Sequence, residues 1–184
     1  MAIVKAAQIV KAEVPDNLND SLAIRCIDVK SGLSKNSGNM MITSSWEVVG
    51  YIDPKSKEVV PDMTVNGEKY EIVGQETQPF YQSLGSQRGI ATHQKFWSKI
   101  TGKPESEYEV DTDNPDISYY KGKVMSAVCV AKLITRTKPQ TEQEIADNVK
   151  KVPIVDDEGN TLPPFKQLEI VHFNRLFTGE VPQF

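Results

Sequence analysis

The sequence predicts a mainly β protein made of a single domain. β-Branched and apolar residues come in short runs bounded by glycine, asparagine, aspartate and proline, and helical periodicity is scarce. Of the 184 residues, 39% are hydrophobic, 25% are charged, 11 are glycine and 11 are proline, which excludes disordered, collagen-like and coiled-coil chains. No internal repeat or low-complexity linker divides the chain, so residues 1–184 are interpreted as one domain.

The first half of the chain predicts hairpins. Residues 3–13 are an apolar stretch whose secondary structure is ambiguous. Alternating residues predict a strand over 22–30 and a return strand over 40–50, joined by a polar loop whose glycines and asparagines accept positive φ. Residues 51–80 are expected to form a hairpin insertion, because Asn66-Gly67 between β-forming residues is a strong hairpin signal.

The second half predicts one helix and two further strands. Ile90, Trp97 and Ile100 lie near one stripe of a helix over 86–100, which Gly102 and Pro104 end, while Gly89 weakens it slightly. Strands are expected over 123–138 and 167–177, separated by a polar insertion over 139–166 with a short helix at 141–150. Residues 178–184 form a C-terminal tail.

This order of elements predicts an OB-fold-like architecture. The order hairpin, further strand or hairpin, helix, strand, insertion and strand matches a five-stranded Greek-key barrel with one helix between strands 3 and 4. The two insertions, 51–80 and 139–166, are additions to that plan.

Motifs for catalysis and for metal or cofactor binding are missing from the sequence. It has no phosphate loop, dinucleotide fingerprint, nucleophile elbow, Cys-x-x-Cys or His-Glu-x-x-His. His93, His172, Cys26 and Cys129 lack the spacing of a zinc site, and the cysteines are expected to be buried thiols in a reducing compartment. Residues 111–116 lack the glycine and distal glutamate of a calcium loop. We therefore expect no enzyme, no metal and no cofactor.

Charge is segregated along the chain, although its net value is −4. Residues 117–138 carry five cations and no acid, and residues 82–104 carry four cations and no acid. Residues 105–116 carry six carboxylates and no cation, and the role of this acidic segment is left open.

The longest apolar run, 124–131, is far shorter than the roughly 20 residues that cross a bilayer. No apolar signal segment follows Met1, so neither membrane insertion nor export is expected.

The basic segments contain the residue types that bind a single-stranded nucleic acid. Such binding needs cations that neutralise phosphates and flat side chains on which bases stack. The candidates are Lys30, Lys35, Tyr119, Tyr120, Lys121, Lys123, Lys132, Arg136, Lys138, Phe173 and Arg175. The aromatic members also fit core positions, and the basic ones also fit a solvated strand face. Trp46 and Trp97 are expected in the core.

Two parts of the sequence carry a family resemblance. Residues 22–32 (LAIRCIDVKSG), 34–41 (SKNSGNMM) and 46–49 (WEVV) resemble the opening of small phage-encoded OB-fold proteins of the single-stranded-DNA-binding type. Residues 122–124 and 127–130, the Asp-Glu-Gly turn at 157–159, residues 168–170 and Phe173 are similar to their second half. Residues 51–80 and 105–116 have no counterpart in that family.

The resemblance implies a sequence-independent single-stranded-DNA-binding protein that acts in phage DNA replication or recombination, in the cytoplasm of an infected host cell. It also implies that Phe184 docks on replication or recombination proteins, and a homo-oligomer is left open. An alternative is a virion structural or assembly protein that uses the β-rich domain as an oligomeric interface. A third reading is an inhibitor in which residues 105–116 imitate phosphates.

Overall fold

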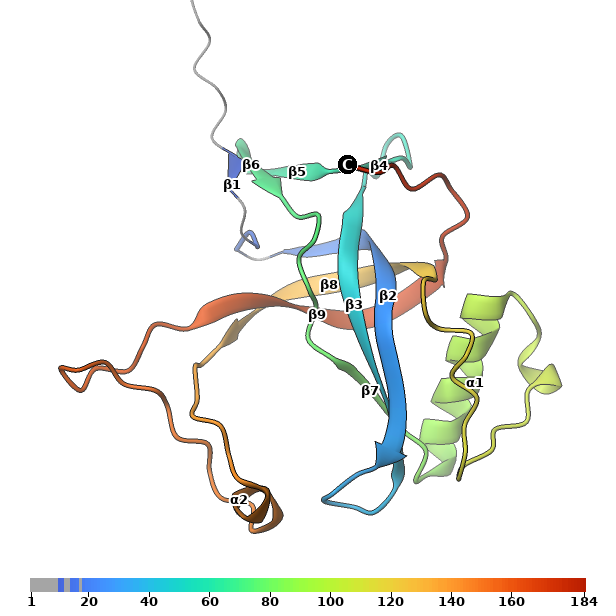
Figure 1. Cartoon of the computed structure of the whole chain (residues 1–184). Helices are drawn as coiled ribbons and strands as arrows, with labels where there is room; N and C mark the ends of the chain where they lie inside the picture. The colour runs from blue at the N-terminus through green and yellow to red at the C-terminus, as the bar shows by residue number, and fades with distance from the viewer. Residues whose placement is uncertain (1–9, 12–13, 17) are drawn as a thin grey trace, which may run out of the picture.

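The computed structural model describes residues 10–11, 14–16 and 18–184, so most of the apolar stretch 3–13 lies outside the described residues. A curled antiparallel sheet forms the centre of the molecule (Figure 1), and we call this sheet the barrel. Its long strands are β2 (Asn19–Leu33), β3 (Met40–Ile52), β8 (Val124–Ile134) and β9 (Phe165–Leu176). They pair in the order β3-β2-β8-β9, and β7 (Phe80–Ser83) pairs with β3. The predicted mainly β, OB-fold-like architecture is confirmed.

The sheet curls where the pairing of β2 with β3 is irregular. The first half of β2 pairs with β8, while nearly its whole length pairs with β3, and irregularities at Ala23/Ile24 and Cys26/Asp28 interrupt the register with β3. Such bulges bend a strand and increase its twist. A parallel bridge between Thr77 and Leu168, with a 2.6 Å bond from the Gln78 amide to the Leu168 carbonyl, joins the segment before β7 to β9. Beyond this bridge, no strand pairing joins β7 to β9 within the described residues.

The insertion over 51–80 contains the hairpin that the sequence predicts. The strands β5 (Asp62–Val65) and β6 (Glu68–Glu71) are joined by Asn66 and Gly67, both with positive φ, and β1 (Val10–Lys11) adds a parallel strand to β6. β4 (Val59–Val60) pairs with the end of β3. The third barrel strand is β7, which begins where the predicted insertion ends. The predicted strand to residue 138 is too long, since β8 ends at Ile134.

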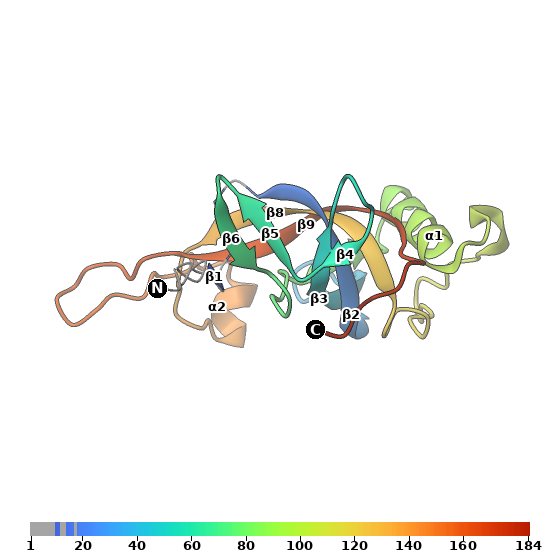
Figure 2. The ribbon, with the colours of Figure 1, turned by 90° about the horizontal axis from the view of Figure 1, so that it is seen from above.

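The polar insertion between β8 and β9 is an extended arm, residues 135–164, which carries the short helix α2 (Glu142–Ala146). Figures 1 and 2 both show this arm projecting from the barrel on the side opposite the helix α1 (Gln87–Thr101). The arm is paired within itself, through bridges between Thr137 and Pro153 and between Val155 and Thr161.

Aromatic rings fill the space between the sheet and α1. Trp46 is fully buried, and the Phe173 ring lies 4.9 Å from the Trp46 ring and 4.8 Å from the Phe96 ring, between centroids. The predicted core positions of Trp46 and Trp97 are confirmed. Cys26 and Cys129 are buried free thiols, as expected, and burial raises the pKa of each to about 12.

The predicted helix is confirmed with both of its ends. The Ser86 hydroxyl caps α1 by accepting a 3.1 Å bond from the Gly89 amide, and Gly102 ends it in the left-handed conformation. Gly89 stands where α1 contacts β7, because a Cβ atom at this position would overlap the carbonyl oxygen of Ser83. The glycine that weakens the helix signal is therefore the residue that allows α1 to contact the barrel.

Replacing Gly89 with alanine is expected to destabilise the protein. Helix propensity alone predicts a gain of about 1 kcal/mol. The overlap with a backbone oxygen, which a side-chain movement does not relieve, is expected to outweigh it, so the free energy of unfolding should fall by about 1–3 kcal/mol. Urea denaturation measures the change. The matched control is Gly32→Ala, whose Cβ meets no atom within 4 Å and which should leave stability unchanged or slightly higher.

Candidate nucleic-acid interface

An exposed row of side chains crosses three strands of the barrel. The pairing registers place Lys30 of β2 opposite Thr43 of β3, and Thr43 opposite Tyr81 of β7. Lys30 is exposed, and Tyr81 is 60% exposed, whereas its neighbours Phe80 and Gln82 are turned toward the core. A cation and a flat aromatic side chain therefore lie on one solvent-facing surface.

A pocket of about 280 Å³ adjoins this row, and we call it the barrel-face pocket. Gly32 lies in its wall, and the Leu33 side chain is 70% exposed. The other lining residues are Lys30, Ser31, Ser34, Met41, Thr43 and Tyr81. The described lining holds no acidic side chain, so the pocket suits an anionic ligand with an apolar or aromatic part.

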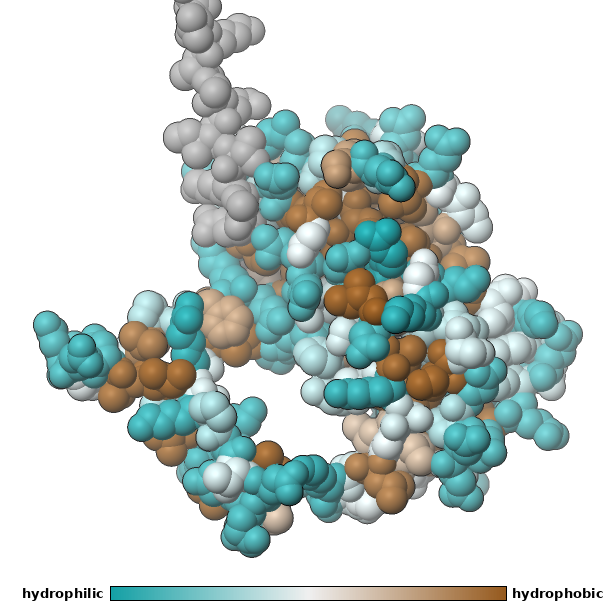
Figure 3. Space-filling view, in the orientation of Figure 1, coloured by the Kyte–Doolittle hydropathy of each residue, from teal (hydrophilic) through white to brown (hydrophobic). Residues whose placement is uncertain are grey.

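Two connections flank this surface. One is the β2–β3 loop, residues 34–39, and the other is the arm. They meet at an exposed ion pair, in which Lys35 Nζ lies 2.5 Å from Glu142 Oε1 of α2. Figure 3 shows an opening between the arm and the barrel. In OB-folds, loops at these two positions contact oligonucleotides and oligosaccharides.

The base of the arm presents further cations. The Arg136 guanidinium lies 5.3 Å from the centroid of the Phe165 ring, which is a cation–π contact. Lys138 is exposed, and its amide pairs with the Val152 carbonyl. Lys132 is partly neutralised, because its Nζ lies 2.9 Å from the Glu169 carboxylate.

The candidate aromatic residues Tyr119, Tyr120 and Phe173 do not form an exposed stacking platform. Tyr120 is 0% exposed and Phe173 is 4% exposed, so neither ring is accessible to a base. Tyr119 is half-buried, with its hydroxyl 3.3 Å from His93 Nε2. Burial raises the pKa of Tyr119 and of Tyr120 well above the ordinary tyrosine range. These three assignments are corrected: the rings belong to the packing between the sheet and α1.

Three cationic candidates lie apart from the row. Lys121 and Lys123 lie on either side of Gly122, in a turn whose backbone is hydrogen-bonded to that of Cys26 in β2. The turn therefore lies along the edge of β2 that does not pair with β3. Arg175 lies on β9, opposite Ser126 of β8. The structure thus places Lys30 on the barrel face and Lys35 in the adjoining loop, where Lys35 pairs with Glu142 of the arm. It leaves Lys121, Lys123 and Arg175 elsewhere.

Tyr81 is not among the residues that the sequence predicts for the interface. Side chains alternate between the two faces of a strand, so Tyr81 points to solvent while its neighbours Phe80 and Gln82 point toward the core. An alternation over so few residues does not identify a strand, because β7 has only four residues.

The acidic segment 105–116 packs on α1 rather than on the barrel face. The Tyr108 ring stacks on the Trp97 ring at 4.7 Å, and the Gln94 amide donates a 3.0 Å bond to the Tyr108 carbonyl. In Figure 1 this segment lies beyond α1, away from the arm. The row of Lys30, Thr43 and Tyr81 is therefore left open.

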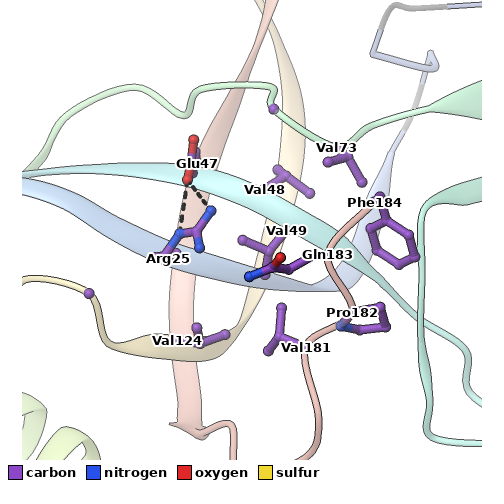
Figure 4. A pocket seen from close by; sticks show the side chains of 12 residues that line it. Arg25, Glu47, Val48, Val49, Val73, Val124, Val181, Pro182, Gln183 and Phe184 are labelled. Carbon is purple, nitrogen blue, oxygen red and sulfur yellow. Dashed lines mark hydrogen bonds and ion pairs between the residues drawn. The ribbon is translucent and has the colours of Figure 1, made fainter.

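A further pocket, of about 490 Å³, lies on another part of the barrel (Figure 4). Its walls hold the Arg25–Glu47 ion pair, at 2.6 Å, and the C-terminal residues Val181 and Phe184. Phe184 is 58% exposed, so its docking on replication or recombination proteins stays a prediction.

Two kinds of feature are absent from the residues that the structure describes. No group of three or more histidine, cysteine, aspartate or glutamate side chains in that part of the chain is arranged to hold a metal ion. Within the same part, none of the helices has the length and apolar character to cross a bilayer. No protein-family model, curated protein or solved structure matches this chain.

Proposed function

We propose that this protein binds single-stranded DNA without sequence preference, and that the barrel face between the β2–β3 loop and the arm is its interface. The phage replication or recombination setting rests on the family resemblance of residues 22–49 and 122–173. Binding is non-catalytic in this proposal.

One observation carries the proposal: Lys30, Thr43 and Tyr81 form a row, with the lysine and the tyrosine exposed, on the face of an OB-like sheet that oligonucleotides use in this architecture. The lysine supplies charge for a phosphate, and the tyrosine supplies a ring for a base. Stacking of a base on an aromatic ring tolerates every base, which agrees with binding that ignores sequence.

The proposal is tested by titrating the protein with labelled single-stranded DNA of about 30 nucleotides, together with RNA and duplex DNA of the same length, at several salt concentrations. The logarithm of the association constant should fall linearly with the logarithm of salt concentration, by about 0.7 for each phosphate neutralised. Tighter binding of RNA would transfer the proposal to RNA. Absence of binding to all three at low salt would refute it.

Replacing Tyr81 with alanine is expected to weaken binding of single-stranded DNA by about 5- to 150-fold, because one stacked base contributes about 1–3 kcal/mol. The salt dependence should stay unchanged, since no charge is removed. Fluorescence anisotropy measures the affinity.

The matched control is Tyr81→Phe, which keeps the ring and should bind nearly as well as the unaltered protein. Both variants should unfold within about 0.5 kcal/mol of it, since the side chain is exposed. Unchanged affinity of Tyr81→Ala would remove Tyr81 from the interface.

A further inference from the structure

Three neighbouring pockets share lining residues in a series that begins at the barrel face and ends at α1. The barrel-face pocket shares Tyr81 with a second pocket of about 250 Å³, which lies between β7 and the start of α1. That second pocket shares Phe80, Gln82 and Thr92 with a third, of about 200 Å³, between α1 and β9. The second and third pockets lie where β7 and β9 are not paired. We call these two together the helix groove.

One face of α1 lines the helix groove with cations. Arg88, Thr92, Lys95 and Lys99 are spaced by four, three and four residues, which places them in one row along the helix. Lys99 is fixed in place, because its Nζ donates a 2.7 Å bond to the Phe173 carbonyl.

The helix groove differs from two other pockets of the protein in that none of the acidic side chains that the structure describes lines it. The described residues that line the helix groove include no acidic side chain, although the net charge of the chain is −4. The pocket beside the C-terminal tail contains Glu47, and a neighbouring one contains Glu58 and Glu180. The helix groove and the barrel-face pocket therefore share Tyr81 in their linings, and each contains cations and no acidic side chain within the described residues, which suits a polyanion.

The floor of the helix groove suits bases as well as phosphates. Phe80 and Phe96 line its apolar part, and Val171 and His172 are exposed on the opposite wall. Gln82, which is 5% exposed, lines both halves of the groove, and its Nε2 is a buried donor without a hydrogen-bond partner among the described atoms. Such a donor is uncommon in a folded protein, but it is buried beside the Tyr120 hydroxyl, so the bases are expected to contact the apolar side chains of the groove rather than Gln82.

We propose that a DNA strand bound on the barrel face continues past Tyr81 into the helix groove, where Arg88, Lys95 and Lys99 hold its phosphates. This inference rests on the proposed function and names the path of the same ligand. The helix that closes the barrel is then part of the interface, and the site is longer than the barrel face.

The test uses the double variant Arg88→Ala/Lys95→Ala, which leaves the fixed Lys99 in place. Its matched control is Lys55→Ala/Lys103→Ala, which removes the same charge from exposed positions outside the three pockets. Each protein is titrated with oligo-dT of increasing length, from about 4 to about 30 nucleotides, over a range of salt concentrations.

The quantity compared is the slope of the logarithm of the association constant against the logarithm of salt concentration. With the longest strand, this slope should be less steep by about 1.4 in the groove variant, because two phosphate contacts of about 0.7 each are removed. The affinity of the groove variant near 0.1 M salt should fall by about 25-fold relative to the unaltered protein. With the shortest strand, which fits on the barrel face alone, the groove variant and the control should bind equally.

Equal behaviour of the groove variant and the control at every length would overturn the path while leaving the proposed function intact, provided that the unaltered protein binds and Tyr81→Ala weakens binding. A groove variant that changes only the mass of the protein in solution would assign the groove to a second copy of the chain, and would also overturn the path. If the unaltered protein binds no strand of any length, the proposed function itself fails.

Discussion

The variant Tyr120→Ala is expected to lose about 3–5 kcal/mol of the free energy of unfolding, which is a large part of the stability of an ordinary domain. The Tyr120 ring is fully buried, and its centroid lies 4.9 Å from that of Phe96. Its hydroxyl donates a 2.5 Å bond to Gln82 Oε1. The substitution therefore leaves a cavity and also removes a buried hydrogen bond.

Urea denaturation followed by tryptophan fluorescence measures this loss, and Tyr81→Ala is the matched comparison. Both variants remove a tyrosine ring, but one ring is buried in the core and the other lies on the barrel face. Tyr120→Ala should be unstable and, at a temperature where it is folded, should bind single-stranded DNA nearly normally. Tyr81→Ala should be stable and should bind weakly. The reverse pattern would restore Tyr120 as a stacking residue and would contradict the assignment of Tyr81.

The parts of the fold that local chemistry determines could be predicted from the sequence. Asn66-Gly67 gives a hairpin because both residues adopt positive φ, and Gly102 ends α1 for the same reason. The strand β7 escaped prediction because its four residues are too few to show a clear period. Its identity as a barrel strand depends on pairing with β3, some 40 residues earlier along the chain.

The sequence predicts some residues of the candidate site but not how tertiary structure brings them together. Exposed lysines on the β2–β3 loop and on the arm could be expected from their segments, but their meeting depends on tertiary structure: Lys35 contacts Glu142 across 107 positions of sequence. Whether an aromatic residue on a strand faces solvent or the core depends on which neighbours pack against it. Tyr120 packs on Phe96 of α1, whereas the Tyr81 side chain is 60% exposed, although both side chains have the same local chemistry.

A buried histidine makes the stability of the protein sensitive to acid. His93 of α1 is fully buried, with Nδ1 3.2 Å from Gln82 Oε1 and Nε2 3.2 Å from the Tyr108 hydroxyl. The Tyr119 and Tyr120 hydroxyls also face the ring, so its polar neighbours carry no negative charge in the acid range. Burial without a carboxylate partner disfavours the imidazolium and lowers the pKa of His93 to about 4.

The free energy of unfolding should therefore fall as the pH drops from about 6.5 toward 4. In this window the unfolded chain binds a proton on His93 and the folded chain does not, so acid favours the unfolded state. The contribution is fully present above pH 6.5, and its loss is complete below the folded pKa. A shift from 6.5 to about 4 corresponds to a loss of about 3 kcal/mol.

The measurement is urea denaturation at a series of pH values, for the unaltered protein and for His93→Gln. Glutamine does not titrate, so subtracting the two curves cancels the acid response that the surface carboxylates share. The subtracted curve should be flat above pH 6.5 and should fall below it. Because the test depends on the slope, it remains valid even where glutamine lowers stability at every pH. Parallel curves for the two proteins would mean that protonated His93 is accommodated in the folded state. The polar cluster around it would then be open to water rather than sealed between α1 and the barrel.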